Sequence, residues 1–481
     1  MQKMDGRLYR FDGFENALAS YYLATQGQMT LDGQHPSNFR EPVPIVFTAL
    51  HLRLFTDIPS LPLSGEMLGP IQQGERISQM EVRYPKEFLR DAWQRIQLSH
   101  VLIPFVFGSM VLLYFLARKF TDKSWLAGVV VLIAWLYFFN SAYFLYRPMT
   151  EYFITFFLLA LSLSLVRLLA APGGRAAFFS GLMFGLAALT KASVFYAALG
   201  VIPVLGFMMH RLKAVNGVQA WRLTAMLASG LLLVTLPWMV RNYVQLGTAS
   251  LSDRGGQVLL TRAFKNQMTG DEYKAAYFVY APYELKTLPA FRHLFGFDDP
   301  KRDLTVELQR LIRSRPGDAQ AAEVGNVDGA ISFFHKAVAY ARLQMRLHPE
   351  DADQRVKAHA LELIQSNLFS HLKTMPLYVW RGIWSFGVPD PVQSYCGGVL
   401  GVVLNVCCFV SFLCLPIYAW ISRRVDLLIV FAVPWGLFWF YASLSHFIPR
   451  YSAPMIPFAV LAFLLLLQVA IKKTGALFFG R

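Results

Sequence analysis

The sequence predicts an all-α integral membrane protein, a polytopic helical bundle with external juxtamembrane helices and a small helical external domain. Apolar stretches of spanning length recur along the chain, and basic residues gather in every second connection between them. The composition is 55% hydrophobic and 15% aromatic, with only 16% charged residues. These values are typical of membrane proteins and exclude an ordinary soluble domain.

About nine stretches are apolar enough to cross a bilayer, because a helix of about 20 apolar residues spans the hydrocarbon core and satisfies its own backbone. The predicted spans are Leu98–Ala117, Ser124–Tyr143, Glu151–Ala170, Ala177–Thr190, Ser193–His210, Arg222–Val240, Cys396–Ile421, Val425–His446 and Tyr451–Ile471. The fourth is the shortest of them.

Basic residues at the span ends set the orientation. The connections that carry them contain Arg118, Lys119, Lys123, Arg167, Arg175, Arg211, Lys213, Arg222, Arg423, Arg424, Lys472 and Lys473. By the positive-inside rule these connections are cytoplasmic. The sequence therefore predicts an external N-terminal loop over 1–97, membrane helices over 98–240, an external helical domain over 241–395 and further membrane helices over 396–481.

The net charge of +15 is explained mostly by these cytoplasmic loops and gives no reason to invoke nucleic acid. All four cysteines, Cys396, Cys407, Cys408 and Cys414, fall within or at the edge of one predicted span. Their spacing matches neither a disulfide framework nor a zinc site, which leaves helix packing as their role.

The external block 1–97 is preceded by no apolar helix that would carry it across the membrane, although long polar segments need one. We therefore expect an upstream first helix, which would bring the total to about ten spans with both ends cytoplasmic.

Both external blocks contain amphipathic patterns. In the first, Phe14, Leu18, Tyr21 and Tyr22 recur at helical spacing. In the second, the segments Leu304–Ile312, Ala330–Leu347 and Ala352–Leu368 are separated by proline and glycine, and Trp380, Arg381 and Trp384 indicate an interfacial helix. A small helical cap over the membrane helices is the simplest arrangement.

Ionisable groups gather at the outer ends of the predicted spans, where a bilayer makes charge costly. They are Arg147, Glu151, Lys191, Arg241, His446 and Arg450. Such charges are functional candidates, and pairing or snorkelling to the interface is the competing interpretation. Several cations beside a few carboxylates suit a lipid-linked phosphate and a proton acceptor.

Several of these segments resemble a known family. DGFENALASYYLATQG followed by FREPVPIVFTAL resembles the first external loop of GT-C glycosyltransferases of the protein O-mannosyltransferase and aminoarabinose-transferase type. PWMVRNYVQLG with the later RGGQVLL is similar to the start of their large external loop. MTEYFITFFLLAL and PRYSAPMIPFAVLAF resemble an early and the last helix. PWMVRNY is the most specific of these motifs.

The resemblance implies a glycosyltransferase of the inner (plasma) membrane with its active site facing the periplasm or exterior. Such enzymes move a sugar from a polyprenyl-phosphate donor to a lipid, glycan or protein acceptor, with inversion at the anomeric carbon.

Carried over by position, Asp12 matches the catalytic acid-base residue and Glu151 the second acidic position. Glu15 is a supporting group. The candidates for the donor phosphate are Arg241, Arg450, Arg40 and Lys191. For each residue the competing interpretation is structural: a solvated helix cap at Asp12, a charge favoured by the helix dipole at Glu151, and helix-end anchors at the cations. The element REPVP is one residue longer than the arginine, proline, tyrosine, proline pattern of the family, so Arg40 does not stand directly before a proline.

Two other functions remain open. A transporter or lipid flippase would also carry intramembrane charges, but we find no internal repeat and the charges gather at one face. A glycan polymerase would use arginine-rich external loops without the helix that begins DGFE. No cofactor is evident in the sequence. A divalent metal could assist the reaction, but no cluster of ligand residues supports one.

The topology makes the first testable prediction. Cysteines introduced at Gly74 and Gly325 should react with impermeant reagents from outside the cell, and one at Gly217 should react only from inside. The reason is that basic residues occur in every second connection, and the positive-inside rule places these connections in the cytoplasm. The measurement is accessibility labelling in a background without the native cysteines. Labelling of Gly217 from outside intact cells would overturn the arrangement.

Overall fold

The structure is a computed structural model that describes residues 12–31, 33–55, 98–121, 123–145, 149–211, 215–298, 308–312, 315, 317–348, 351–387 and 394–479. Within these residues the chain is mainly helical, and Thr30 and Pro36 form an isolated antiparallel bridge. Most of the predicted external loop 1–97, including Gly74, lies outside the described residues, as does Arg147.

The chain divides into two compact units. Unit 1 comprises Met1–Ser252 with Pro416–Val433, and unit 2 comprises Asp253–Leu415 with Pro434–Arg481. The division falls close to the start of the predicted external domain, whose exact boundaries stay predictions.

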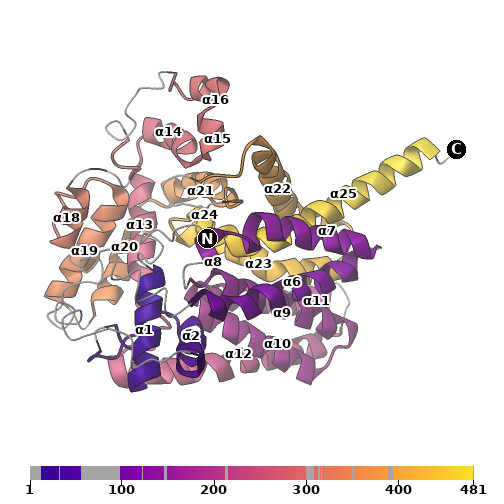
Figure 1. Cartoon of the computed structure of the whole chain (residues 1–481), viewed down its shortest axis with the longest axis horizontal. Helices are drawn as coiled ribbons and strands as arrows, with labels where there is room; N and C mark the ends of the chain where they lie inside the picture. Colours follow the sequence, from indigo (N-terminus) through magenta and orange to yellow (C-terminus); the bar gives the residue numbers. More distant parts are fainter. Residues whose placement is uncertain are drawn as a thin grey trace. The chain divides into compact units, whose positions relative to one another are not determined.

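Unit 1 is built from the helices of the first half of the chain (Figure 1). They are α1 (Asp12–Gln26), α2 (Pro42–Phe55), α6 (Ile103–Phe120), α7 (Ser124–Ala134), α8 (Ala142–Leu145), α9 (Glu151–Ala170), α10 (Gly174–Thr190), α11 (Ala192–Arg211) and α12 (Gly217–Leu246), with the short helical turns η3 (Leu98–Leu102) and η4 (Trp135–Phe139).

Seven helices are long and apolar enough to cross a membrane within the described part of the chain: His100–Phe120, Glu151–Ala170, Ala192–Arg211, Gly217–Leu246, Val399–Ile421, Val425–Leu444 and Pro449–Lys472. They confirm seven of the predicted stretches and make this a multi-pass helical membrane protein. The other two stretches form the shorter apolar helices Ser124–Phe139 and Gly174–Thr190, so the count of nine stays a prediction.

Local sequence explains where the long helix α12 begins and ends. The side chain of Asn216 accepts a hydrogen bond from the backbone N–H of Gln219, which satisfies one of the free donors of the first turn. Gly247 ends the helix in the left-handed region at φ 70°, a conformation that glycine adopts without steric cost.

Helices α10 and α12 pack with their backbones in contact. Gly181 and Gly185 lie four residues apart on α10, and Gly181 faces Gly230 of α12. A Cβ atom on Gly181 would lie 2.9 Å from the Cα of Gly230 and would collide with the carbonyl oxygen of Leu227. Small residues at this spacing allow membrane helices to approach closely.

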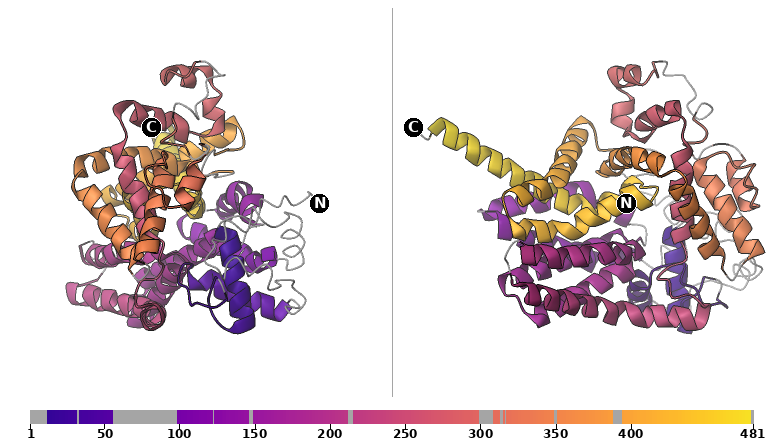
Figure 2. Two further views of the ribbon diagram at one scale, coloured as in Figure 1. Left: turned by 90° about the vertical axis from the view of Figure 1, so that its left-hand side faces the viewer. Right: turned by 180° about the vertical axis from the view of Figure 1, so that it is seen from behind.

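Unit 2 contains the helices that follow Ser252 (Figures 1 and 2). They are α13 (Gly255–Phe264), α14 (Gly270–Tyr280), α15 (Tyr283–Lys286), α16 (Pro289–Leu294), α18 (Asp318–Glu323), α19 (Phe333–Leu347), α20 (Ala352–Gln365), α21 (Leu368–Ile383), α24 (Pro449–Ser452) and α25 (Ile456–Phe479), with the turns η5 (Lys265–Gln267) and η6 (Ala453–Met455). The spans α22 (Val399–Ile421) and α23 (Val425–Leu444) run from one unit into the other.

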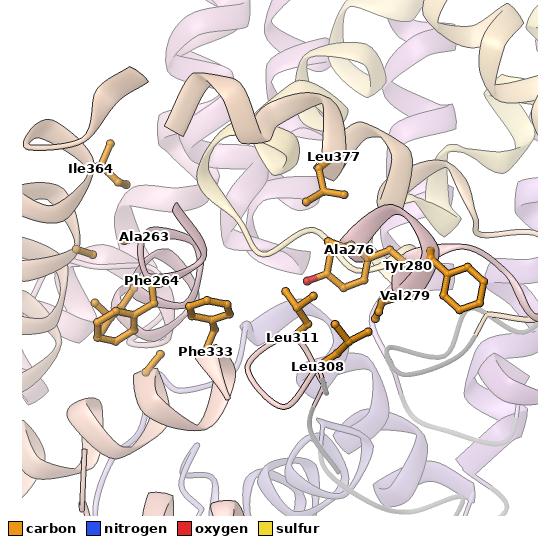
Figure 3. Close-up of a cluster of buried hydrophobic side chains, with 14 of the residues drawn as sticks. Ala263, Phe264, Ala276, Val279, Tyr280, Leu308, Leu311, Phe333, Ile364 and Leu377 are labelled. Atoms are coloured by element: carbon orange, nitrogen blue, oxygen red, sulfur yellow. The ribbon is translucent and has the colours of Figure 1, made fainter. Parts of the chain in front are cut away.

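The polar part of unit 2 has a hydrophobic core of its own (Figure 3). Leu260, Phe264, Phe333 and Leu377 contribute buried side chains from α13, α19 and α21. The predicted amphipathic segments at 330–347 and 352–368 correspond to α19 and α20, which confirms the helical character of this block.

The residues of the predicted interfacial helix lie on α21 and directly after it. Trp380 and Arg381 lie on α21, and Trp384 follows it. The side chain of Trp384 is 1% exposed and Arg381 is 4% exposed, so both pack inside unit 2. The interfacial position of this helix stays a prediction.

The contact between α10 and α12 makes a stability prediction. Gly181→Ala should lower the free energy of unfolding by about 1 to 3 kcal/mol, because the added methyl group meets backbone atoms that cannot move aside. Gly200→Ala on α11 is the control, since a Cβ there has no neighbour within 4 Å. Thermal unfolding in detergent measures both. Equal stability of the two variants would contradict the close helix crossing.

Candidate functional site

The strongest candidate site is an ion cluster that joins the start of α1 to the residue before α2. The Nη2 atom of Arg40 lies 2.6 Å from the Oδ1 atom of Asp12 and also donates to the Oε2 atom of Glu15. Asp12 and Glu15 occupy the first turn of α1, one turn apart, so both carboxylates face the same guanidinium. Three of the predicted residues are thereby brought together.

Arg40 is the most buried member of this cluster. Its side chain is 4% exposed, whereas Asp12 and Glu15 keep 19% and 21% of their side chains exposed. Burial by itself would lower the pKa of Arg40, but the carboxylates of Asp12, Glu15 and Glu41 outweigh it and raise the pKa above its ordinary value. Arg40 is therefore fixed as a cation, and its Nε atom has no hydrogen-bond partner among the described residues.

The segment between α1 and α2 positions Arg40. Gly27 ends α1 with φ 71°, and the bridge between Thr30 and Pro36 folds the chain back toward α2. Gly33 also has a positive φ, and a Cβ there would lie 2.9 Å from the ring of the buried Tyr22. Glycine is the residue that this tight turn requires.

Arg241 holds this segment from α12. Its Nη1 atom donates to the carbonyl oxygen of Ser37 at 3.1 Å, and its Nη2 atom lies 3.4 Å from the carbonyl oxygen of Met29. The guanidinium carbon also lies 4.7 Å from the centre of the Trp238 ring, a cation–π contact. Arg241 is thus placed as an anchor of the loop, and whether it also binds a donor phosphate stays a prediction.

The neighbours of Arg241 extend the same support. The indole N–H of Trp238 donates to the carbonyl oxygen of Leu251 at 3.0 Å, and the Asn242 amide donates to the carbonyl oxygen of Ser250 at 2.7 Å. Asn38 donates to the hydroxyl of Ser250 at 3.2 Å. The motif PWMVRNY therefore ties two polar segments, about 200 residues apart in sequence, to one helix.

Glu41, which the sequence analysis did not select, links the site to Lys191. The backbone N–H of Ala192, the first residue of α11, donates to the Oε1 atom of Glu41 at 3.3 Å. Lys191 lies between α10 and α11, immediately before this contact. Glu41 belongs to REPVP, so this element contacts the start of α11 as well as forming part of the ion cluster through Arg40. In the sequence, the position of Glu41 directly after Arg40 is the feature that could have identified it as a site residue.

The two remaining predicted residues are Glu151 and Arg450. Glu151 is 2% exposed at the N-terminus of α9 in unit 1, where a helix dipole favours negative charge. Arg450 lies on α24 in unit 2, with its guanidinium 5.8 Å from the ring of Tyr451. The structure therefore does not assign Arg450 to the cluster around Arg40.

The chemistry of the cluster is that of a carboxylate pair neutralised in part by one arginine. An anion that attracts Arg40 would free Asp12 to accept a proton, since a carboxylate bound to arginine is a weaker base. Within the described ranges no three His, Cys, Asp or Glu side chains form a group that could hold a metal ion.

Comparison of the chain with protein-family models, curated proteins and solved structures returned no match.

The ion cluster makes a prediction about stability and pH. Arg40→Met should lower the free energy of unfolding by about 1 to 3 kcal/mol at pH 7, because two neighbouring carboxylates lose their cation. The deficit should shrink toward pH 4, since protonation removes the repulsion between Asp12 and Glu15. Thermal unfolding between pH 4 and 8 measures this.

Arg53→Met is the matched control, because Arg53 is an exposed arginine on α2. The double variant Arg40→Met, Glu15→Gln should recover part of the lost stability. A deficit that is independent of pH and is not relieved by Glu15→Gln would show that the charges are not coupled.

Proposed function

We propose that this protein is a glycosyltransferase that moves a sugar from a polyprenyl-phosphate donor to a lipid, glycan or protein acceptor at the outer face of the cytoplasmic membrane. The observation that carries the proposal is the contact of Arg40 with Asp12 and Glu15. It joins the two elements, DGFE and REPVP, on which the resemblance to GT-C glycosyltransferases depends.

In this proposal Asp12 is the general base. It accepts the proton of the acceptor hydroxyl or amine while the acceptor attacks the anomeric carbon, and the polyprenyl phosphate leaves. Displacement at the anomeric carbon with one attack inverts its configuration. Asp12 keeps 19% of its side chain exposed, so an acceptor can reach it, and Arg40 holds it in place.

Arg40 has a second role in the proposal. The phosphate of the donor competes with Asp12 for the guanidinium, because arginine binds phosphate with two or more charge-assisted hydrogen bonds. Donor binding then weakens the contact between Arg40 and Asp12 and makes Asp12 a stronger base. Glu15 keeps Arg40 in the site during this exchange, since its carboxylate is the other partner of the same nitrogen.

The other candidate residues have supporting roles in the proposal. Arg241 orders the segment that carries Arg40, through Ser37 and Met29. Lys191 immediately precedes Ala192, whose backbone N–H donates to Glu41 of REPVP. Glu151 and Arg450 are proposed as a second acidic group and a second phosphate contact on the basis of the resemblance alone.

The decisive substitution is Asp12→Asn, which keeps size and hydrogen bonding but removes the proton acceptor. Turnover should fall by about 10² or more, as the loss of a general base does, while binding of the lipid donor persists. The assay incubates purified full-length protein with membrane lipid extract and follows transfer of the lipid-linked sugar by mass spectrometry.

Asp426→Asn provides the control, because Asp426 keeps 41% of its side chain exposed and pairs with Arg424 at a connection predicted to be cytoplasmic. Glu15→Gln should retain more activity than Asp12→Asn, because its carboxylate supports Arg40 and accepts no proton. Normal transfer by Asp12→Asn would place the catalytic site elsewhere. The absence of transfer by the wild type would raise the transporter or flippase to first place. If Asp12→Asn shortened a polymeric product without reducing single transfers, the result would indicate the glycan polymerase.

A further inference from the structure

Several large apolar side chains stay exposed on and between α15 and α16 in unit 2. Tyr283 is 47% exposed, Leu288 45% and Leu294 73%. Single exposed apolar side chains are ordinary on a protein surface, so their exposure alone says nothing about function. Their position beside a membrane span makes these three informative, because exposed apolar patches mark interaction sites.

Hydrogen bonds hold α15 against the chain that leads into the span α22. The backbone N–H of Tyr283 donates to the carbonyl oxygen of Ser394 at 2.8 Å. The Oε1 atom of Glu284 accepts from the backbone N–H groups of Cys396 and Gly398, at 2.8 Å and 3.0 Å. Because α22 begins at the next residue, these contacts fix α15 at one end of the span.

The beginning of α22 is itself exposed. Val399 and Leu400 are its first two residues, and they are 70% and 68% exposed. α22 is one of the helices apolar enough to cross a membrane, so in a bilayer these two side chains contact lipid. Tyr395, just before the helix, is 47% exposed as well. The lipid that surrounds the first turn of α22 therefore lies next to Tyr283.

The core of unit 2 determines which side chains of α16 remain outside. The rings of Phe291 and Phe295 lie 5.8 Å and 6.2 Å from the ring of Phe278, which is buried in that core. Leu288 and Leu294 stand at the two ends of α16 and stay exposed. Figure 1 shows α15 and α16, which contact each other, at an edge of unit 2. An apolar environment for the two leucines must come from outside the chain.

We propose that the segment 283–294 is an interfacial anchor, which inserts Tyr283, Leu288 and Leu294 into the lipid leaflet beside the start of α22. Interfacial elements bury their apolar side chains about 5 to 10 Å into the boundary between headgroups and acyl chains. Tyrosine suits this boundary, because its ring is apolar and its hydroxyl can reach the headgroups. The positive-inside pattern predicts that this leaflet is the outer one. The proposal does not depend on the proposed glycosyl transfer, because it uses α15, α16 and α22 alone.

The anchor has a consequence for the polar part of unit 2. Phe278 lies on α14 and belongs to the hydrophobic core, so its contacts with Phe291 and Phe295 connect that core to the anchor. Only Ala281 and Pro282 separate α14 from α15. Insertion of the segment in lipid thereby limits the movement of this core relative to α22.

The first test places one thiol at a time in full-length protein that lacks the native cysteines. Leu294→Cys carries the probe, and Leu347→Cys is the matched control, because Leu347 is 60% exposed at the end of α19. α19 packs on α13, α18 and α20, which are helices of the polar part of unit 2. Each thiol is labelled with bimane, and the protein is reconstituted in phosphatidylcholine nanodiscs.

Phosphatidylcholine with a nitroxide near the top of its acyl chain should quench the probe at Leu294→Cys about threefold or more as strongly as the probe at Leu347→Cys, because only an inserted side chain reaches that depth. Iodide, which stays in water, should show the reverse order. Equal quenching of the two probes by each quencher would overturn the proposal. So would disulfide-linked dimers of unlabelled Leu294→Cys without quenching by lipid, since a second copy of the chain would then cover the segment.

A second test keeps the native cysteines and follows cleavage by trypsin in nanodiscs. The segment contains Lys286 and Arg292, at which trypsin cleaves. The double variant Leu288→Asn, Leu294→Asn should be cleaved within 283–294 about tenfold or more faster than the wild type, because it favours the detached form. Leu347→Asn should leave this rate unchanged. An equal cleavage rate in the double variant and the wild type would contradict the anchor, because side chains that face water gain nothing from lipid.

Discussion

Guanidinium groups hold the polar segments of this protein in place. In unit 1 Arg40 joins α1 to α2 through two carboxylates, and Arg241 joins the loop between them to α12 through two carbonyl oxygens. In unit 2 Arg381 fixes the carbonyl oxygen of His446 before α24. The guanidinium presents five donors in a fixed plane and can bind several oxygens at once, whereas a lysine has three donors on a single nitrogen.

Arg40 and Arg241 of unit 1 differ in whether a ligand could replace their partners. The partners of Arg241 are mainly backbone oxygens, so its removal would release a loop. The partners of Arg40 in the cluster are ionised side chains, which a ligand phosphate can replace. For this reason the proposed chemistry is centred on Arg40 and Asp12, although PWMVRNY is the more specific motif in the sequence. A motif can mark a family through the scaffold of a site as well as through its reacting groups.

The spans and the polar segments are stabilised in different ways. Helices α10 and α12 pack through glycine, so van der Waals contact between backbones carries the association. The polar part of unit 2 instead buries Leu260, Phe264 and Phe333 in a core of the kind found in water-soluble proteins.

The sequence by itself determined the all-helical, multi-pass character of the chain and the position of seven of its spanning helices. Hydropathy averaged over about 20 residues is a local property, so it needs no knowledge of the fold. The helical spacing of Leu18 and Tyr22 likewise predicted α1, on which both side chains are buried. The resemblance selected Asp12, Glu15 and Arg40, and the structure places these three together.

Only the tertiary structure decided how the remaining groups are used. The contact of Arg241 with Ser37 spans about 200 residues of sequence, and that of Glu41 with Ala192 about 150. The approach of Arg262 to Tyr378 joins α13 to α21 in the same way. No local pattern encodes such contacts, because they depend on which helix faces meet after packing. Arg450 was grouped with the other cations by its position at a span end, and packing assigned it to the other unit.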